Sequence, residues 1–266
     1  MKKILKNVFA FLYKLFLFFA NNYAYRQITD YKSIPIVIIS FNQLFYLQKL
    51  VSFLLKYEYK NIIIVDNNST YPPLLQYFET IKTMVKIHQL TDNAGHMVFW
   101  NNKEIFDLYS KGYYIITDAD IVPIETCPEN FVEKLMTVLN ENLRITKAGL
   151  SLKIDDIPDS NPNKSAIVKW ESQFWQKKVG KGQYKSATDT TFALYKPNYK
   201  YKEKRFYKAI RLDKPYQAYH GGWYIDFKNL SDEQKYYIKT TNSSSSWKTD
   251  EQGNLNNRGF ENDYKN

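Results

Sequence analysis

The chain is poor in cysteine. Its 266 residues include a single one, Cys127, so no disulfide can form within the chain. This composition is typical of proteins from a reducing compartment. A lone thiol without an evident partner indicates a packed side chain more than a nucleophile.

The chain is also poor in glycine, with nine in all. No G-x-G-x-x-G follows the first predicted strand, and no G-x-x-x-x-G-K-[ST] occurs, which argues against a dinucleotide-binding Rossmann protein and a P-loop nucleotidase. No internal repeat is evident, and 44% hydrophobic residues suffice for a sizeable core.

Residues 1–24 lack an apolar run of ordinary membrane-spanning length, because Lys14 divides the Phe- and Leu-rich stretch. The small-residue cleavage pattern of a signal peptide is missing as well. Lys2, Lys3, Lys6 and Lys14 among aromatic and aliphatic residues predict a helix that lies in a membrane interface. The alternative is a helix packed on the protein's own core.

From residue 34 the pattern alternates between strands and helices. We predict strands over 34–39, 61–65, 85–90 and 113–116, with helices over 44–55, 72–81 and 98–109. This order predicts an α/β domain with a mostly parallel, doubly wound sheet flanked by helices. We assign residues 30–230 to this domain and residues 231–266 to a polar C-terminal tail.

Later segments continue the domain. We predict a helix over 129–142, strands over 148–154 and 192–195, and a mobile Gly/Lys-rich loop over 179–185.

The most informative stretch is YYIITDADIVP, residues 113–123, in which a buried strand leads directly into Asp118 and Asp120. Ligands of open α/β sheets bind beyond the carboxyl ends of the strands. Two carboxylates there can join a divalent cation to phosphate oxygens. The alternative is that both residues only cap a turn before Pro123. Asp66 and Asn93 follow earlier strands, so we expect them on the same rim.

These segments together carry a resemblance. IPIVIISFNQ, IIIVDNNST, DNAGH and the D-x-D of YYIITDADIVP resemble family 2-like glycosyltransferases of the GT-A fold, the kind found in bacterial surface-polysaccharide synthesis such as capsule or lipooligosaccharide. TDTTFALY and PYQAYHGGWY extend the resemblance to about Tyr224. It implies a nucleotide-sugar donor, first of all a UDP-sugar, Mn²⁺ or Mg²⁺ as cofactor, and a saccharide or lipid-linked acceptor. It also implies a cytoplasmic enzyme, peripheral at the inner face of the bacterial plasma membrane through residues 1–24, without a nucleic-acid partner.

The resemblance assigns roles to individual residues. Asp118 and Asp120 would hold the metal with His220, whose following glycines let backbone approach a ligand. Donor-binding residues would be Asp66, Asn93, Gly95, His96 and Asp118. Asp189 would be the general base, although it departs from the Glu-Asp pair common in this family and is equally compatible with pairing to a lysine. Asp155 and Asp156 would meet the acceptor or form a capped turn.

Three other functions compete with this interpretation. A metal-dependent sugar nucleotidyltransferase would be expected to carry a Gly-rich N-terminal loop, which is missing. A basic nucleic-acid-binding protein would account for the net charge of +10, but not for carboxylates at the strand ends. A non-catalytic membrane-surface protein on the same fold would not need the D-x-D.

Overall fold

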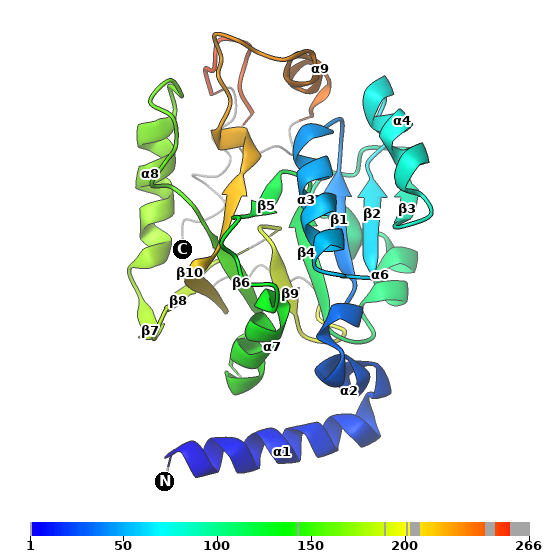
Figure 1. The fold of residues 1–266 in the computed structure, drawn as a ribbon, viewed down its shortest axis with the longest axis vertical. Coiled ribbons are helices and arrows are strands. Elements are labelled where there is room, and N and C mark those ends of the chain that lie inside the picture. Colours follow the sequence, from blue (N-terminus) through cyan, green and yellow to red (C-terminus); the bar gives the residue numbers. More distant parts are fainter. Residues whose placement is uncertain are drawn as a thin grey trace.

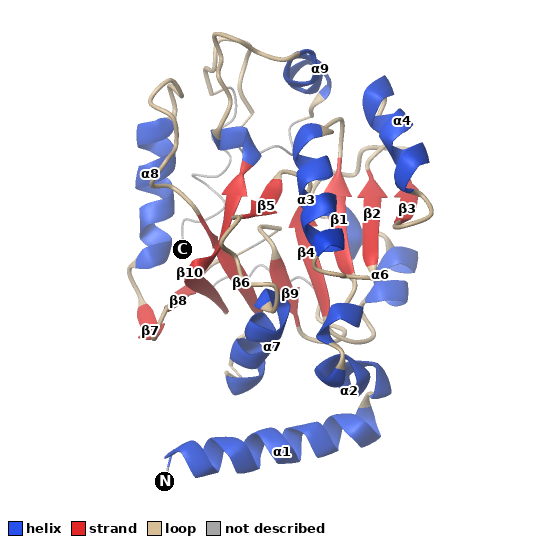
Figure 2. Cartoon of the chain, viewed as in Figure 1, coloured by secondary structure: helices blue, strands red, loops and turns tan. Residues whose placement is uncertain are grey.

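The computed structural model describes residues 2–142, 144–188, 190–200, 202, 208–242 and 248–255 (Figures 1 and 2). These residues form one ten-stranded sheet with the order β3-β2-β1-β4-β9-β6-β10-β8-β7, and β5 pairs with β10 outside this path. The strands that begin the chain are parallel to one another: β1 (Ile36–Ser40), β2 (Ile62–Asp66), β3 (Lys86–Gln89) and β4 (Tyr114–Asp118).

Helices connect these parallel strands. They are α3 (Phe45–Lys56), α4 (Pro72–Ile81), α5 (Val98–Asn101) and α6 (Lys103–Tyr109). The single helix predicted over 98–109 is wrong in one respect, because it is broken at Asn102. The Asn102 side chain accepts a hydrogen bond from the Ile105 N–H at 3.1 Å, as an N-cap does, so a second helix starts there.

The later part of the sheet contains both parallel and antiparallel pairs. Its strands are β5 (Ile121–Pro123), β6 (Lys147–Leu152), β7 (Lys178–Gly180), β8 (Gln183–Ser186), β9 (Ala193–Tyr195) and β10 (Ala209–His220). β9 is antiparallel to both β4 and β6, whereas β6 and β10 are parallel. The helices are α7 (Phe131–Glu141), α8 (Lys164–Ser172) and α9 (Asp232–Thr240). The predicted α/β fold, a mostly parallel central sheet flanked by helices, is confirmed.

The loop predicted over 179–185 is a β-hairpin of β7 and β8. Gly182 has φ +64°, which glycine adopts without strain, so the chain reverses within two residues. β8 then pairs with β10.

The core lies on both faces of the sheet. Ile36 and Ile38 of β1 pack in the cluster that contains α3, α4 and α7 side chains. Val37 and Ile39 pack in the cluster with α5 and α6. Because successive strand residues point to opposite faces, a strand buried on both faces reads as a continuous apolar run.

Two helices precede β1, namely α1 (Lys2–Ala20) and α2 (Asn22–Thr29). They lie at the amino ends of the parallel strands, at the bottom of Figure 1. Gln27 of α2 is buried and bonds the backbone of Tyr113, which precedes β4: its Oε1 accepts from the N–H at 2.7 Å, and its Nε2 donates to the carbonyl at 2.9 Å. Among the described residues, no helix combines the length and apolar character that crossing a membrane requires.

We expect Gln27→Ala to lower the free energy of unfolding by about 2 kcal/mol, because it leaves a buried N–H and a buried carbonyl without partners. Urea denaturation followed by circular dichroism measures the change. The exposed Gln76→Ala is the matched control and should remain close to wild type. Equal stability of all three proteins would contradict the described attachment of α2.

We expect Cys127 to react slowly with a thiol reagent in the folded protein. Its side chain is 2% exposed, and burial raises the pKa of its thiol to about 12, so little thiolate is present near neutral pH. Denaturant should restore the rate of an ordinary cysteine in an Ellman assay. Rapid labelling of the folded chain would show that Cys127 is accessible.

Candidate functional site

Three parallel strands end side by side at the upper edge of the sheet in Figure 1. β1 lies between β2 and β4, where Ser40 is in register with Asp66 and Ile39 with Asp118. Neighbouring strands are about 4.8 Å apart, so the backbones of Asp66 and Asp118 are roughly 10 Å apart across β1. Both acidic residues therefore border one rim.

Asp118 is the last residue of β4 and is partly exposed. Its N–H donates to the Thr190 carbonyl at 2.8 Å, and its Oδ2 accepts from the Thr190 hydroxyl at 2.5 Å. The segment just before β9 thus orients the first carboxylate of the D-x-D.

Asp120 is 7% exposed and is held by the end of β10. Its Oδ2 lies 3.2 Å from Nδ1 of His220 and accepts a hydrogen bond from the Gly222 N–H at 3.1 Å. The Gly221 N–H donates to the Asp120 carbonyl at 2.8 Å. The His220 ring stacks on Trp223 with centroids 4.7 Å apart, which fixes its plane.

These contacts set the charges of the pair. Burial by itself would raise the pKa of Asp120, but attraction to His220 and the hydrogen bond from the Gly222 N–H outweigh it and lower that pKa. Burial would conversely lower the pKa of His220, and the Asp120 carboxylate raises it instead. Both shifts favour an ionised Asp120 carboxylate beside a protonated His220 ring.

The donor set suits a hard divalent cation that is shared with a ligand. Within the described residues, no group of three or more His, Cys, Asp or Glu side chains is arranged as a complete metal site. Mg²⁺ commonly uses one or two carboxylates together with substrate phosphates, and Asp118 and Asp120 supply that number at a sheet edge. His220 contacts Asp120 directly, and its role as a metal ligand stays a prediction.

Asp66, predicted to bind the nucleoside, is 1% exposed in this structure. Its Oδ2 accepts from the Ser69 N–H at 2.9 Å and its Oδ1 from the Ser69 hydroxyl at 2.5 Å. Burial raises the pKa of Asp66, and the bonds from Ser69 oppose that rise. Asp66 thus shapes the turn after β2, and a direct contact with a nucleoside stays a prediction.

The predicted donor-pocket residues Asn93, Gly95 and His96 lie in the loop after β3. The Asn93 Oδ1 accepts from the Gly95 N–H at 3.0 Å, and Gly95 has φ +75°. His96 is exposed. Asn67 joins this loop to the end of β2, because its Nδ2 donates to the Gly95 carbonyl at 3.2 Å. Asn67, which directly follows Asp66, is a rim residue that the sequence pattern did not indicate.

A helix from the predicted polar tail covers part of the same rim. The Glu233 carboxylate of α9 accepts from the Phe45 N–H at 3.1 Å, and the Tyr236 hydroxyl donates to the Thr70 carbonyl at 3.1 Å. Burial, with added contributions from Asp120 and Glu233, raises the pKa of Tyr46 to about 12. Tyr46 and Glu233 are therefore rim residues that the sequence pattern did not indicate. For Glu233 the reason is that α9 has no buried apolar face and so gives no helical periodicity in the sequence.

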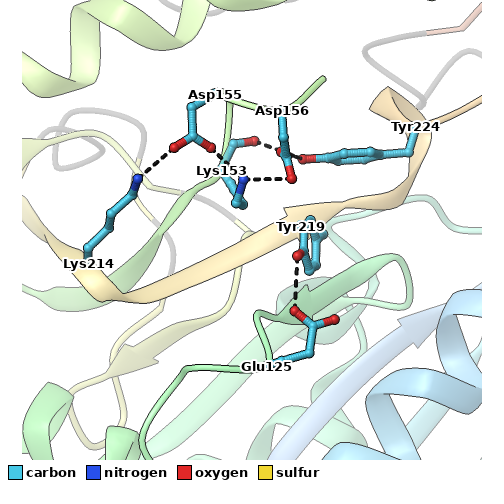
Figure 3. Close-up of polar contacts among 7 residues, drawn as sticks. All are labelled: Glu125, Lys153, Asp155, Asp156, Lys214, Tyr219 and Tyr224. Atoms are coloured by element: carbon cyan, nitrogen blue, oxygen red, sulfur yellow. Dashed lines mark hydrogen bonds and ion pairs between the residues drawn. The ribbon is translucent and has the colours of Figure 1, made fainter. Parts of the chain in front are cut away.

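Asp155 and Asp156 lie in a network of ion pairs beside β10 (Figure 3). Lys153 Nζ is 2.5 Å from Asp155 and 2.6 Å from Asp156, and Lys214 Nζ is 2.6 Å from Asp155. The Tyr224 hydroxyl donates to Asp156 at 2.7 Å.

Hydrogen bonds from both lysines lower the pKa of Asp155 to about 2. A carboxylate of such low basicity binds hydroxyl groups better than it removes their protons. The predicted base Asp189 lies outside the described residues.

Comparison with solved structures finds likeness at low identity. The mannosyltransferase PcManGT from Pyrobaculum calidifontis, in complex with GDP-Man and Mn²⁺, matches 71% of this chain and 56% of its own, with TM-score 0.44 and 11% identity. S. aureus TarS 1–349 matches 77% of this chain and 68% of its own, with TM-score 0.44 and 14% identity. The same protein in complex with UDP matches 70% and 59%, with TM-score 0.43 and 14% identity. This chain thus spans little more than half of the mannosyltransferase.

No protein-family model matches the chain, and a search of curated proteins finds no match.

We expect Gly221→Ala to disturb the rim. A Cβ at Gly221 would come within 2.3 Å of Cδ2 of Tyr46, so the ring or the end of β10 must move. Overpacking of this kind costs about 1–3 kcal/mol of stability, and the shift would loosen the backbone that holds Asp120. Chemical denaturation measures the cost. Gly180→Ala is the control, since its Cβ would meet Gln183 at 3.4 Å, an ordinary contact; an equal effect of both changes would argue against close packing on Tyr46.

Proposed function

We propose that the protein is a metal-dependent glycosyltransferase of the GT-A kind. It transfers a sugar from a nucleotide-sugar donor, first of all a UDP-sugar, to a saccharide or lipid-linked acceptor in bacterial surface-polysaccharide synthesis. The observation that carries the proposal is the Asp118-Ala119-Asp120 sequence at the carboxyl end of β4, with Asp120 anchored 3.2 Å from His220. The motifs described above support the choice of donor and pathway.

In this proposal Asp118 and Asp120 hold Mn²⁺ or Mg²⁺, with His220 beside them. When bound, the cation offsets the negative charge that develops on the departing nucleoside diphosphate. The chain's own contribution is orientation. Thr190 positions Asp118, and the N–H groups of Gly221 and Gly222 position Asp120. The lowered pKa of Asp120 keeps this carboxylate ionised and able to accept a cation without first losing a proton.

The nucleoside is proposed to lie along the ends of β2 and β3. Asp66 and Ser69 make the turn there, and Asn67 holds the loop of Asn93, Gly95 and His96 beside it. A buried, hydrogen-bonded turn of this kind has a defined backbone shape before a ligand binds. Binding a nucleoside there therefore costs little additional ordering of the chain.

The acceptor is proposed to lie on the β10 side of the rim. Asp155 and Asp156 offer hydrogen-bond acceptors, and Lys153, Lys214 and Tyr224 beside them offer donors, so both kinds of group are present for sugar hydroxyls. Asp189 is proposed as the general base that takes the proton of the attacking hydroxyl.

Calorimetric titration tests the proposal. We expect UDP to bind wild type only when Mn²⁺ or Mg²⁺ is present, because the diphosphate and two carboxylates repel each other without it. Asp118→Asn and Asp120→Asn should weaken this binding about tenfold or more, whereas Asp155→Asn, which changes a carboxylate away from the D-x-D, should bind UDP as wild type does. Thermal unfolding of each variant separates loss of binding from loss of fold.

Three results would overturn the proposal in different ways. UDP binding that needs no metal ion would show that the D-x-D does not join a cation to the diphosphate. Binding of a nucleoside triphosphate with release of pyrophosphate from a sugar phosphate would identify a nucleotidyltransferase. Tight RNA binding with a steep salt dependence, and no UDP binding, would identify a nucleic-acid-binding protein.

A further inference from the structure

Helix α1 exposes an unusual amount of apolar side chain. Among the α1 side chains that the structure describes, seven large hydrophobic ones are 45% to 78% exposed: Val8, Phe11, Leu12, Leu15, Phe16, Phe18 and Phe19. At about 100° of rotation per residue, they occupy one continuous face of roughly 160°. Isolated exposed hydrophobic residues are normal, but a contiguous face of this kind marks an interaction surface.

The opposite side of α1 attaches the helix to the domain. Leu17 is buried, and the Tyr13 hydroxyl is 3.2 Å from the Tyr113 hydroxyl. After the helix, Asn21 Nδ2 donates to the Lys111 carbonyl at 2.8 Å. Figure 1 shows α1 at the edge of the domain, below the amino ends of the parallel strands. Because the Leu17 side is held against the domain, the exposed apolar side chains lie on the side of α1 that faces away from it.

Charge selects the partner of this face. Residues 1–29 contain Lys2, Lys3, Lys6, Lys14 and Arg26 and no Asp or Glu, and the whole chain carries +10. Exposed Lys111 lies beside the end of this segment. A second copy of the helix would bring like charges together, whereas an anionic lipid surface offers both acyl chains for the aromatic residues and headgroups for the lysines.

We propose that α1 docks on an anionic lipid bilayer and turns the candidate site away from it. The orientation follows from β4, because the docking helix lies at one end of this strand and the candidate site at the other. Tyr113, directly before its amino end, contacts α1 and α2, and its last residue is Asp118. At about 3.3 Å per residue, the D-x-D is roughly 17 Å farther from the docking helix along this strand.

This orientation restricts the acceptor, a consequence that rests on the proposed function. A sugar directly at the headgroups of the same bilayer would lie on the wrong side of the domain. The orientation therefore suits a saccharide chain that extends well beyond the headgroups, or a soluble acceptor.

Vesicle sedimentation with the full chain tests the docking and requires no enzyme activity, so it stands apart from the nucleotide titration. We expect binding to phosphatidylcholine vesicles that contain phosphatidylglycerol and weaker binding to phosphatidylcholine alone. F11E/F16E should reduce partitioning more than about tenfold, because two large apolar side chains no longer enter the acyl region. L108E/V179E adds the same charges at exposed apolar positions elsewhere and should bind as wild type does.

Two outcomes would overturn docking. One is no binding of wild type to either vesicle, and the other is equal binding of F11E/F16E. If wild type is also a dimer in light scattering and F11E/F16E a monomer, the face joins two copies of the chain instead.

A fluorophore tests the orientation. It is placed at Asn22→Cys near α1 or at Asp92→Cys on the rim, both exposed positions, while buried Cys127 stays unlabelled. Lipids with a nitroxide headgroup should quench the first label and leave the second unchanged. Quenching at position 92 would mean that the rim faces the bilayer.

Discussion

A buried carboxylate is costly unless nearby charges and hydrogen-bond donors replace the water that it loses. Asp120 meets this constraint through residues that lie about a hundred positions later, His220 and the N–H groups of Gly221 and Gly222. The same contact aligns β10 with the turn between β4 and β5. Because β10 also pairs with β5, β6 and β8, this contact sets the position of the later part of the sheet relative to the D-x-D. The geometry of the candidate metal site therefore depends on this one set of contacts between Asp120 and the end of β10.

The rim is built with few glycines. Asparagine and aspartate side chains make its turns in their place, since they hydrogen-bond nearby backbone and tolerate positive φ. Asn42, at φ 48°, accepts from the N–H groups of Thr70 and Tyr71 and donates to Thr240 of α9. Asn67 joins β2 to the loop after β3 in the same way. Side-chain amides thus supply the rigidity that backbone–backbone bonds would provide in a glycine loop, and α9 is part of this framework.

The two ends of β4 have different surroundings: a charged rim at one end and the two N-terminal helices at the other. Its carboxyl end carries charges that need a cation, and its amino end receives α1 and α2 through Tyr113. Parallel strands share one direction, so every loop that follows a strand contributes to the rim, while the apolar face of α1 lies at the other end of the sheet. A docked molecule would present its polar rim to the aqueous side.

The sequence by itself determined the alternation of strands and helices from Ile36 to Asp118, because hydrophobic periodicity is local and each buried strand reads as an apolar run. It also located Asp66, Asn93 and the D-x-D on one edge, since parallel strands end together. Tertiary structure alone decided which groups neutralise Asp120, that two lysines hold Asp155, and that α9 covers the rim. It also decided that residues 178–186 form a hairpin and which face of α1 stays uncovered. These features depend on contacts between residues far apart in the chain, for which no local period exists.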